Sequence, residues 1–189
     1  IVRLQGATPI AIKLTVPDFA VNWDEVRAAI TPRTRMIIVN TPHNPSGQVF
    51  SAADLHQLAA LTRHTDIIIL SDEVYEHVVF DGEPHHGMAT HPQLAERSVI
   101  ISSFGKTYHV TGWRVGYCVA PAELMDEICK VHQFLMFSAD TPMQYAFAEH
   151  MTDPQTWLSL SAFYQRKRDL LHSLLADSPF TLLPSAGSF

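Results

Sequence analysis

The chain contains 189 residues, 47% of them hydrophobic, which is enough to bury the core of one domain and to begin a second. Its 13 basic and 19 acidic residues give a formal net charge of −6, and this acidic balance argues against nucleic acid as a partner. The aliphatic runs fall far short of the roughly twenty residues that cross a bilayer, so we expect no membrane partner, and two cysteines without a CxxC pair favour a reduced, cytoplasmic setting.

Apolar segments of strand length alternate with helical patterns along the chain. Five strands are expected, near residues 10–16, 36–40, 67–71, 98–102 and 115–120. This alternation is typical of an α/β fold with a mostly parallel central sheet flanked by helices. Because such sheets bind ligands outside the carboxyl ends of their strands, the polar residues after each strand are the first candidates for a functional site.

Two helices are expected between and after these strands. Ser51 and Asp54 form a capping box that begins a helix to about His64. Pro121 suits the first turn of the second helix. An apolar stripe at helical spacing follows and is interpreted as core packing; its members are Leu124, Ile128, Val131 and Leu135.

The longest helix is expected from Asp153 and Pro154 to about Ala176. It carries a cluster of three basic residues, Arg166, Lys167 and Arg168. The simplest interpretation of this cluster is a solvated helix face.

The string NTPHNPSG follows the strand expected at 36–40 and is strong turn chemistry. Pro45 restricts Asn44 to extended geometry, so the turn presents a side-chain amide at the end of a buried strand. Such an amide can donate to a ligand oxygen.

In the string IIILSDEVY, the strand expected at 67–71 is followed by the carboxylates Asp72 and Glu73. Tyr75 lies three residues after Asp72. A carboxylate at a strand end can pair with a protonated pyridine nitrogen, and a phenol can donate to an oxygen on the same ring. Taken alone, Asp72 could equally cap a helix or turn, and Tyr75 fits core packing.

The string SSFGKTYHVTGWRVGY places Ser103 three residues before Lys106 and Arg114 eight residues after it. The amine of a lysine can form a Schiff base with the aldehyde of pyridoxal phosphate. A hydroxyl and a bidentate guanidinium suit the phosphate of the same cofactor. Three such residues alone could also be ordinary surface residues, and the two blocks upstream favour the cofactor site.

Together the blocks NTPHNPSG, SDEVYEHVVF and SSFGKTYHVTGWRVGYCVAP resemble the class I/II aminotransferases, which depend on pyridoxal phosphate and have fold type I. They are most similar to the branch with methionine, kynurenine and glutamine-phenylpyruvate aminotransferases. The resemblance implies that Lys106 bonds to the cofactor and shuttles a proton, with Asp72 and Tyr75 as the other catalytic residues.

The cofactor-binding residues implied by the resemblance are Asn44, Asp72, Tyr75, Ser103, Lys106 and Arg114. The implied partners are an amino acid, methionine or aromatic in type, a 2-oxo acid and a second copy of the chain in a homodimer. A C–S β-lyase on the same scaffold and a non-catalytic regulatory or interaction fragment remain as alternatives.

Members of this family are roughly twice as long, so the chain is expected to be an internal piece. Residues 1–152 would belong to the large cofactor domain, 153–176 to the interdomain helix and 177–189 to the start of the small domain. The family's phosphate-binding glycine loop, ring-stacking aromatic residue and carboxylate-binding arginine match no position here. We therefore expect weak or absent turnover by this chain alone.

The eleven histidines form no HExxH motif and no paired Cys/His spacing, so no metal site is expected. His85 and His86 lie in a loop with glycine and proline and are interpreted as surface residues. The side chains between the lysine and the arginine could either shape the pocket or pack around their loop; they are His109, Thr111 and Trp113.

Overall fold

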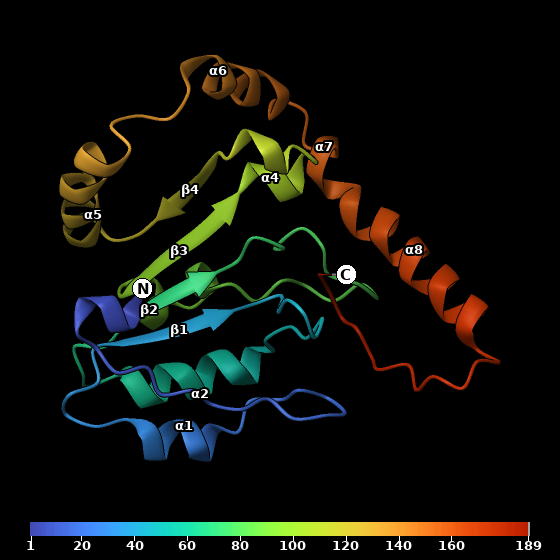
Figure 1. Ribbon diagram of the computed structural model, residues 1–189, viewed down its shortest axis with the longest axis horizontal. Coiled ribbons are helices and arrows are strands. Elements are labelled where there is room, and N and C mark those ends of the chain that lie inside the picture. The colour runs from blue at the N-terminus through green and yellow to red at the C-terminus, as the bar shows by residue number, and fades with distance from the viewer. Residues whose placement is uncertain (189) are drawn as a thin grey trace.

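A computed structural model describes residues 1–188 and places a four-stranded sheet at their centre (Figure 1). The strands β1 (Met36–Asn40), β2 (Ile68–Asp72), β3 (Ser98–Ser103) and β4 (Gly116–Val119) lie in that order. The first three are parallel, and β4 is antiparallel to β3. This confirms the predicted α/β class and its mostly parallel sheet, and four of the five expected strands form close to their predicted bounds.

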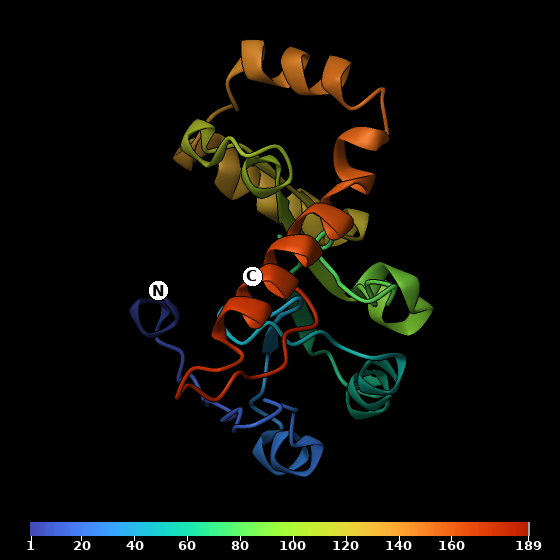
Figure 2. The ribbon, with the colours of Figure 1, turned by 90° about the vertical axis from the view of Figure 1, so that its right-hand side faces the viewer.

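The helices occupy the connections and the C-terminal third. They are α1 (Trp23–Ala29), α2 (Ala52–Thr62), α3 (Pro92–Ala95), α4 (Phe104–Thr107), α5 (Ala122–Leu135), α6 (Thr141–His150), α7 (Gln155–Leu158) and α8 (Leu160–Leu175). Short 3₁₀ turns lie at η1 (Val2–Gln5), η2 (Met88–Thr90) and η3 (Thr111–Trp113). Figure 2 shows α8 crossing in front of the sheet when the molecule is viewed from the side of that helix.

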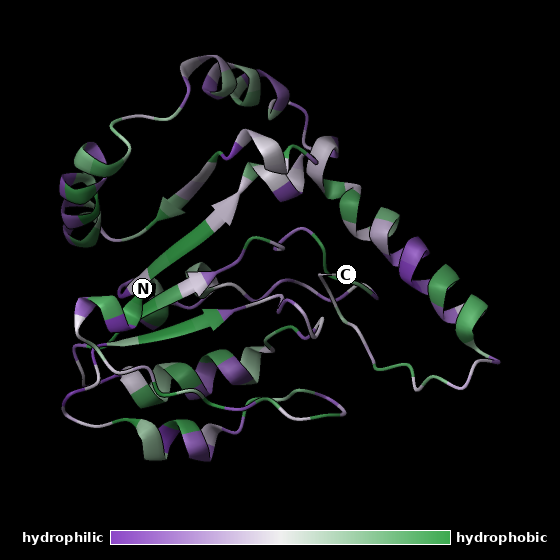
Figure 3. Cartoon of the chain, viewed as in Figure 1, coloured by the Kyte–Doolittle hydropathy of each residue, from purple (hydrophilic) through white to green (hydrophobic). Residues whose placement is uncertain are grey.

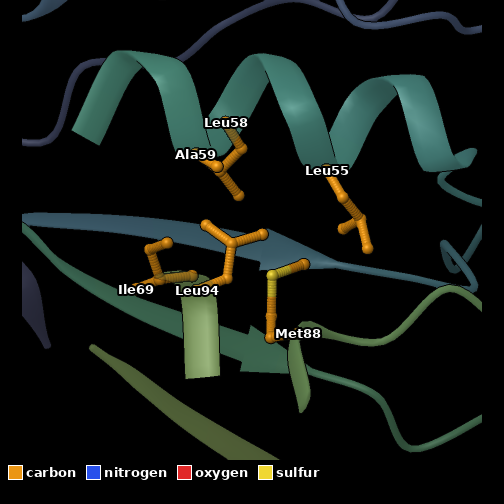
Figure 4. Close-up of a cluster of buried hydrophobic side chains, with 6 residues drawn as sticks. All are labelled: Leu55, Leu58, Ala59, Ile69, Met88 and Leu94. Atoms are coloured by element: carbon orange, nitrogen blue, oxygen red, sulfur yellow. The ribbon is translucent and has the colours of Figure 1, made fainter. Parts of the chain in front are cut away.

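The core lies between α2 and one face of the sheet (Figure 4). Leu55 and Leu58 of α2 pack over Ile69 of β2, with Met88 and Leu94 closing the cluster. The predicted capping box starts α2: the Ser51 backbone N–H donates to Asp54 at 2.8 Å, and the Asp54 N–H donates to the Ser51 hydroxyl at 3.2 Å. The cap fixes where the helix begins, and its apolar face then sets its position over β2.

The strand expected at residues 10–16 is not formed in the described chain. Ile10 and Val16 at its two ends are largely exposed. A strand needs a neighbour to take up its backbone hydrogen bonds, and this segment does not pair with the sheet, whose first strand is β1. The apolar pattern thus predicted a strand, but none forms because the segment does not pair with a neighbouring strand.

The apolar stripe on α5 does not pack as predicted. The helix forms as expected, but it has no buried residue, and Val131 and Leu135 are 57% and 76% exposed. In Figure 1 α5 lies at the periphery, beyond β4, with α6 following it along the outer side. Leu124 and Ile128 at the start of the stripe are half-buried, whereas Val131 and Leu135 at its end are not covered by the described residues. The periodicity therefore correctly predicted the helix but not its surroundings.

The strands are apolar along much of their length (Figure 3). Ile37, Val39 and Ile100 pack on the core with α2, so their alternating neighbours Ile38 and Ile101 point to the other face, where both are exposed.

The predicted long helix over 153–176 is interrupted, since α7 ends at Leu158 and α8 starts at Leu160. Its basic cluster is only partly a solvated face. Arg168 keeps a side chain that is 12% exposed and pairs with Asp81 beyond β2. Leu160, at the start of α8, packs with Tyr75 and Phe80. The helix is thus fixed against the segment that follows β2.

Candidate active site

Strand register brings the three sequence blocks to one edge of the sheet. Asn40 at the end of β1 lies opposite Asp72 at the end of β2, and Asp72 lies opposite Ile101 of β3. Ser103 follows two residues after Ile101 on the same face of its strand. The carboxyl ends of the three parallel strands therefore meet where open α/β sheets bind ligands.

The loops after β1 and β2 are joined by side-chain amides. The Asn40 amide donates to the backbone carbonyl of Asp72 at 3.0 Å, and the Asn40 side-chain oxygen accepts from the Asn44 N–H at 2.9 Å. The Asn44 amide in turn donates to the phenol oxygen of Tyr75 at 3.4 Å. Asn40, for which the sequence predicted no role, therefore helps to bring Asn44 close to Tyr75.

Lys106 lies on α4, a single helical turn that starts directly after β3. The Ser103 hydroxyl caps this turn by accepting from the Gly105 N–H at 3.1 Å. The Lys106 ammonium lies 5.8 Å from the centroid of the Tyr75 ring. The lysine therefore faces the segment that carries Asp72 and Tyr75.

Ser103 and the segment before β4 are brought together by the antiparallel pair β3–β4. Ser103 lies opposite Gly116, and its hydroxyl donates to the Val115 carbonyl at 3.4 Å. Arg114 adopts a left-handed conformation with φ 57°, and its guanidinium donates to the Thr111 carbonyl at 3.3 Å. Ser103 and Arg114 are neighbours along this edge, but the described residues show no hydrogen bond between their side chains.

The residues between Lys106 and Arg114 pack around their loop. Thr111 donates to the Gly105 carbonyl at 3.1 Å, and the Trp113 ring lies 5.4 Å from that of Phe147. His109 lies 3.2 Å from the Tyr164 hydroxyl. These contacts favour the packing interpretation over a direct role in a pocket.

The gathered side chains match the chemistry of pyridoxal phosphate group by group. A carboxylate at Asp72 suits its ring nitrogen, a phenol and an amide suit its ring oxygen, and an amine at Lys106 suits its aldehyde. A hydroxyl and a guanidinium at the β3–β4 edge suit its phosphate. The set thus fits this cofactor in both charge and hydrogen-bonding type.

The comparison with known proteins agrees with this chemistry. The family model for aminotransferase class I and II matches residues 1–189. The chain belongs to this family. Members of the family use pyridoxal phosphate, the cofactor expected from the sequence.

One relative of this aminotransferase-family chain is methionine aminotransferase from Escherichia coli, which is 47% identical over 189 residues. The match covers 100% of the chain and 49% of the relative. A kynurenine–oxoglutarate transaminase from Dictyostelium discoideum is 41% identical over 94% of the chain and 42% of its own length. The chain thus spans about half the length of these curated relatives.

Solved structures of the family share the fold. An Escherichia coli protein identified as a methionine aminotransferase superposes with a TM-score of 0.97 at 47% identity, over 98% of this chain and 50% of that one. An aromatic aminotransferase from Pyrococcus horikoshii gives a TM-score of 0.91 at 31% identity, over 100% of this chain and 52% of that one. The predicted fold type I architecture is confirmed by these neighbours.

No helix in residues 1–188 combines the length and apolar character that a membrane span requires. The same residues contain no group of three or more histidine, cysteine, aspartate and glutamate side chains placed to hold a metal ion.

Two carboxylates near the candidate active site, Glu76 and Glu73, were not predicted from the sequence. Glu76 accepts from the Ser102 hydroxyl at 2.7 Å and from the Tyr117 hydroxyl at 2.8 Å, which ties the segment after β2 to β3 and β4. Burial, and then the charge of Glu76, raises the pKa of Tyr117 to about 12.

His85, interpreted as a surface residue, is instead paired with buried Glu73 at 2.8 Å. The alternation of side chains along a strand could have predicted that Glu73 is buried. Glu73 directly follows Asp72, so it must face the core if Asp72 faces the site.

Proposed function

We propose that the full-length protein is a pyridoxal-phosphate-dependent aminotransferase that moves the amino group of methionine or an aromatic amino acid to a 2-oxo acid. The observation that carries this proposal is the convergence of Asn44, Asp72, Tyr75 and Lys106 at the carboxyl ends of β1–β3. The methionine and kynurenine aminotransferases among the relatives support the substrate class.

The cofactor supplies an aldehyde that takes up the amino group and a ring that accepts electrons when the substrate α-carbon loses its proton. Lys106 Nζ would hold that aldehyde until the substrate amine displaces it. The freed amine would then take the α-proton and deliver it to the cofactor carbon. This proton transfer requires Lys106 to stay within reach of both atoms, which its position on the short helix α4 favours.

The other side chains would hold the cofactor in place. The Asp72 carboxylate would keep a proton on the ring nitrogen, and the Tyr75 phenol and Asn44 amide would hydrogen-bond the ring oxygen. Ser103 and Arg114 would bind the phosphate, Arg114 through two parallel hydrogen bonds. Arg114 is exposed, so its guanidinium is accessible to such a ligand.

We further propose a homodimer in the cytoplasm, with 1–152 in the large domain, 153–176 as the interdomain helix and 177–189 entering the small domain. Exposed Phe134 in the last turn of α5 and Phe137 in the linker to α6 offer apolar surface for a second copy. Cys118 and Cys129 are free thiols, which is consistent with a reducing compartment.

The test of the proposed function is the absorbance spectrum of the full-length protein with pyridoxal phosphate. Wild type should show the band of lysine-bound cofactor, and borohydride should make the attachment permanent. Lys106→Ala should lose both, whereas Lys130→Ala, a change at an exposed lysine of α5, should keep them. An unchanged band in Lys106→Ala would refute the lysine assignment.

Product analysis then separates the reaction classes. Wild type with methionine or phenylalanine and a 2-oxo acid should transfer the amino group. Pyruvate and ammonia from a sulfur amino acid would instead identify a C–S β-lyase, and no reaction with any amino acid would identify a non-catalytic module. Residues 1–189 alone should show weak or no turnover.

A further inference from the structure

Glu73 is a buried carboxylate with three hydrogen-bond donors, directly after Asp72. It is 3% exposed. One carboxylate oxygen accepts from the Ser71 hydroxyl at 2.8 Å and from the Met88 N–H at 3.0 Å, and the other accepts from His85 Nε2 at 2.8 Å. All three donors are protein groups, so this carboxylate is fully engaged on the core side of the sheet.

Asp72 and Glu73 share a peptide unit but point to opposite sides of the sheet. Asp72 belongs to the face with the candidate active site, and Glu73 faces the core together with Ser71. The Asp72 carbonyl accepts from the Thr41 N–H at 3.0 Å, and the Glu73 N–H donates to the Ile101 carbonyl at 2.8 Å. These two hydrogen bonds hold the peptide unit between Asp72 and Glu73 in the sheet, and the Glu73 side chain ties the same unit to the core.

The loop that supplies the donors is built around the Glu73 carboxylate. A Cβ at Gly87 would lie 2.2 Å from a Glu73 carboxylate oxygen, so only glycine lets the backbone approach this closely. Met88 on the far side of the glycine is fully buried under α2 (Figure 4). The loop is thereby fixed in the core and holds Glu73 in one place.

The charge of Glu73 is maintained in this setting. Burial alone would raise the pKa of Glu73, but hydrogen bonds from His85 and Met88, together with the charge of His85, lower it below its ordinary value. A buried ion pair is seldom more stabilising than apolar residues of the same volume. The pair is therefore better explained by the geometry that it imposes than by the stability that it adds.

We propose that the Glu73–His85 pair positions the end of β2, so that the Asp72 carboxylate stays aligned with the ring nitrogen of the cofactor. This rests on the proposed function, because Asp72 matters only if a pyridine ring binds there. Neither residue touches the cofactor. Both act through the backbone of Asp72.

The experiment compares three variants of the full-length protein loaded with pyridoxal phosphate. His85→Ala removes the donor to Glu73, His85→Gln retains a donor, and His86→Gln changes the neighbouring histidine, which makes no hydrogen bond among the described residues. The readouts are kcat and KM, the pH titration of the bound cofactor's absorbance, and thermal unfolding without cofactor.

His85→Ala should lower kcat about tenfold or more, with KM changed less than about threefold, because misalignment affects the reaction more than substrate binding. It should also shift the midpoint of the absorbance titration, since the ring nitrogen loses its aligned carboxylate. His85→Gln should recover most of both effects, and His86→Gln should match wild type. Should His85→Ala not fold, Glu73→Gln tests the same split between kcat and KM.

A lower melting temperature with unchanged kcat and absorbance titration would show that the pair only stabilises the fold, and would overturn the positioning role alone. A failure of His85→Gln to recover kcat would overturn it too. If wild type forms no band of lysine-bound cofactor, the proposed function fails and the positioning role with it. The spectrum of wild type thus distinguishes the two failures.

Discussion

Arg168 of α8 holds Asp81 with two hydrogen bonds, from Nη1 to Oδ2 at 2.6 Å and from Nη2 to Oδ1 at 2.7 Å. The same guanidinium donates to the Ser185 carbonyl at 2.9 Å and lies 4.9 Å from the centroid of the Phe80 ring. One side chain therefore joins α8, the segment after β2 and the C-terminal segment that contains Ser185.

Replacing this guanidinium by an ammonium should weaken the junction. Arg168→Lys cannot form the paired hydrogen bonds to Asp81, and because Asp81 is more than half exposed we expect a loss of only about 1 kcal/mol in the free energy of unfolding. Denaturant unfolding measures the change, with Arg166→Lys on the exposed side of α8 as the control. Equal stability of the two variants would contradict the proposed junction.

The Arg168–Asp81 pair should make the free energy of unfolding decrease as the pH becomes acidic. The hydrogen bonds from Arg168 hold the pKa of Asp81 below its ordinary value. The contribution of the pair is therefore complete above the pKa of an unfolded aspartate, about 3.9, and is lost as the pH falls through the lower folded value. Arg168→Lys should remove part of this acid dependence, which unfolding curves at a series of acidic pH values would record.

Asp72→Asn should separate cofactor binding from reaction in the full-length protein. The amide keeps the shape of the side chain but cannot hold a proton on the ring nitrogen by charge, so we expect cofactor to bind and kcat to fall about 100-fold or more. The control is Asp66→Asn, an exposed aspartate before β2. A kcat close to wild type in Asp72→Asn would remove Asp72 from the site.

Gly116→Ala should disturb the edge where Ser103 and Arg114 lie. A Cβ at Gly116 would lie 2.6 Å from the Ser102 carbonyl oxygen, so β3 and β4 must move apart. We expect a loss of about 1–3 kcal/mol in stability, the range typical of overpacking, and weaker cofactor binding in the full-length protein. Gly112→Ala is the matched control because no atom lies within 4 Å of its added Cβ. If both variants bind cofactor like wild type, this edge does not hold the phosphate.

Tyr117→Phe should change the alkaline side of the stability profile. Since the pKa of Tyr117 is raised to about 12, its neutral form contributes stability that is complete below about pH 10, the ordinary value for tyrosine, and is lost as the pH rises through about 12. The variant should lack this component and lose about 1 kcal/mol at neutral pH with the hydrogen bond to Glu76. Tyr145→Phe, at an exposed tyrosine, serves as the control in unfolding at high pH.

The fold was predictable from the sequence where local chemistry and burial agree. The capping box at Ser51 and the strand that ends in Asp72 form close to their predicted bounds, because a polar cap or strand end directly adjoins an apolar run. The same agreement brought Asn44, Tyr75 and Lys106 together, since residues at the ends of adjacent parallel strands share one edge.

The features that the sequence did not predict depend on contacts between distant segments. His85 belongs in the core only because Glu73 lies there to receive it, and Arg168 is covered only because Asp81 reaches α8. The reverse holds for Val131, whose apolar side chain finds no cover in residues 1–188. Local patterns predict whether a side chain prefers burial or solvent. Contacts with distant segments determine whether it is in fact buried or exposed.

The two adjacent carboxylates of β2 also constrain how this protein can diverge. Alternation gives Asp72 to the ligand edge and Glu73 to the core, so a deletion or insertion of one residue within β2 would exchange their places. Substitutions at single positions leave this parity intact, whereas a change of length by one destroys the site and buries the wrong acid. We therefore expect β2 to keep a constant length among proteins that share this chemistry, with length variation confined to the loops on either side.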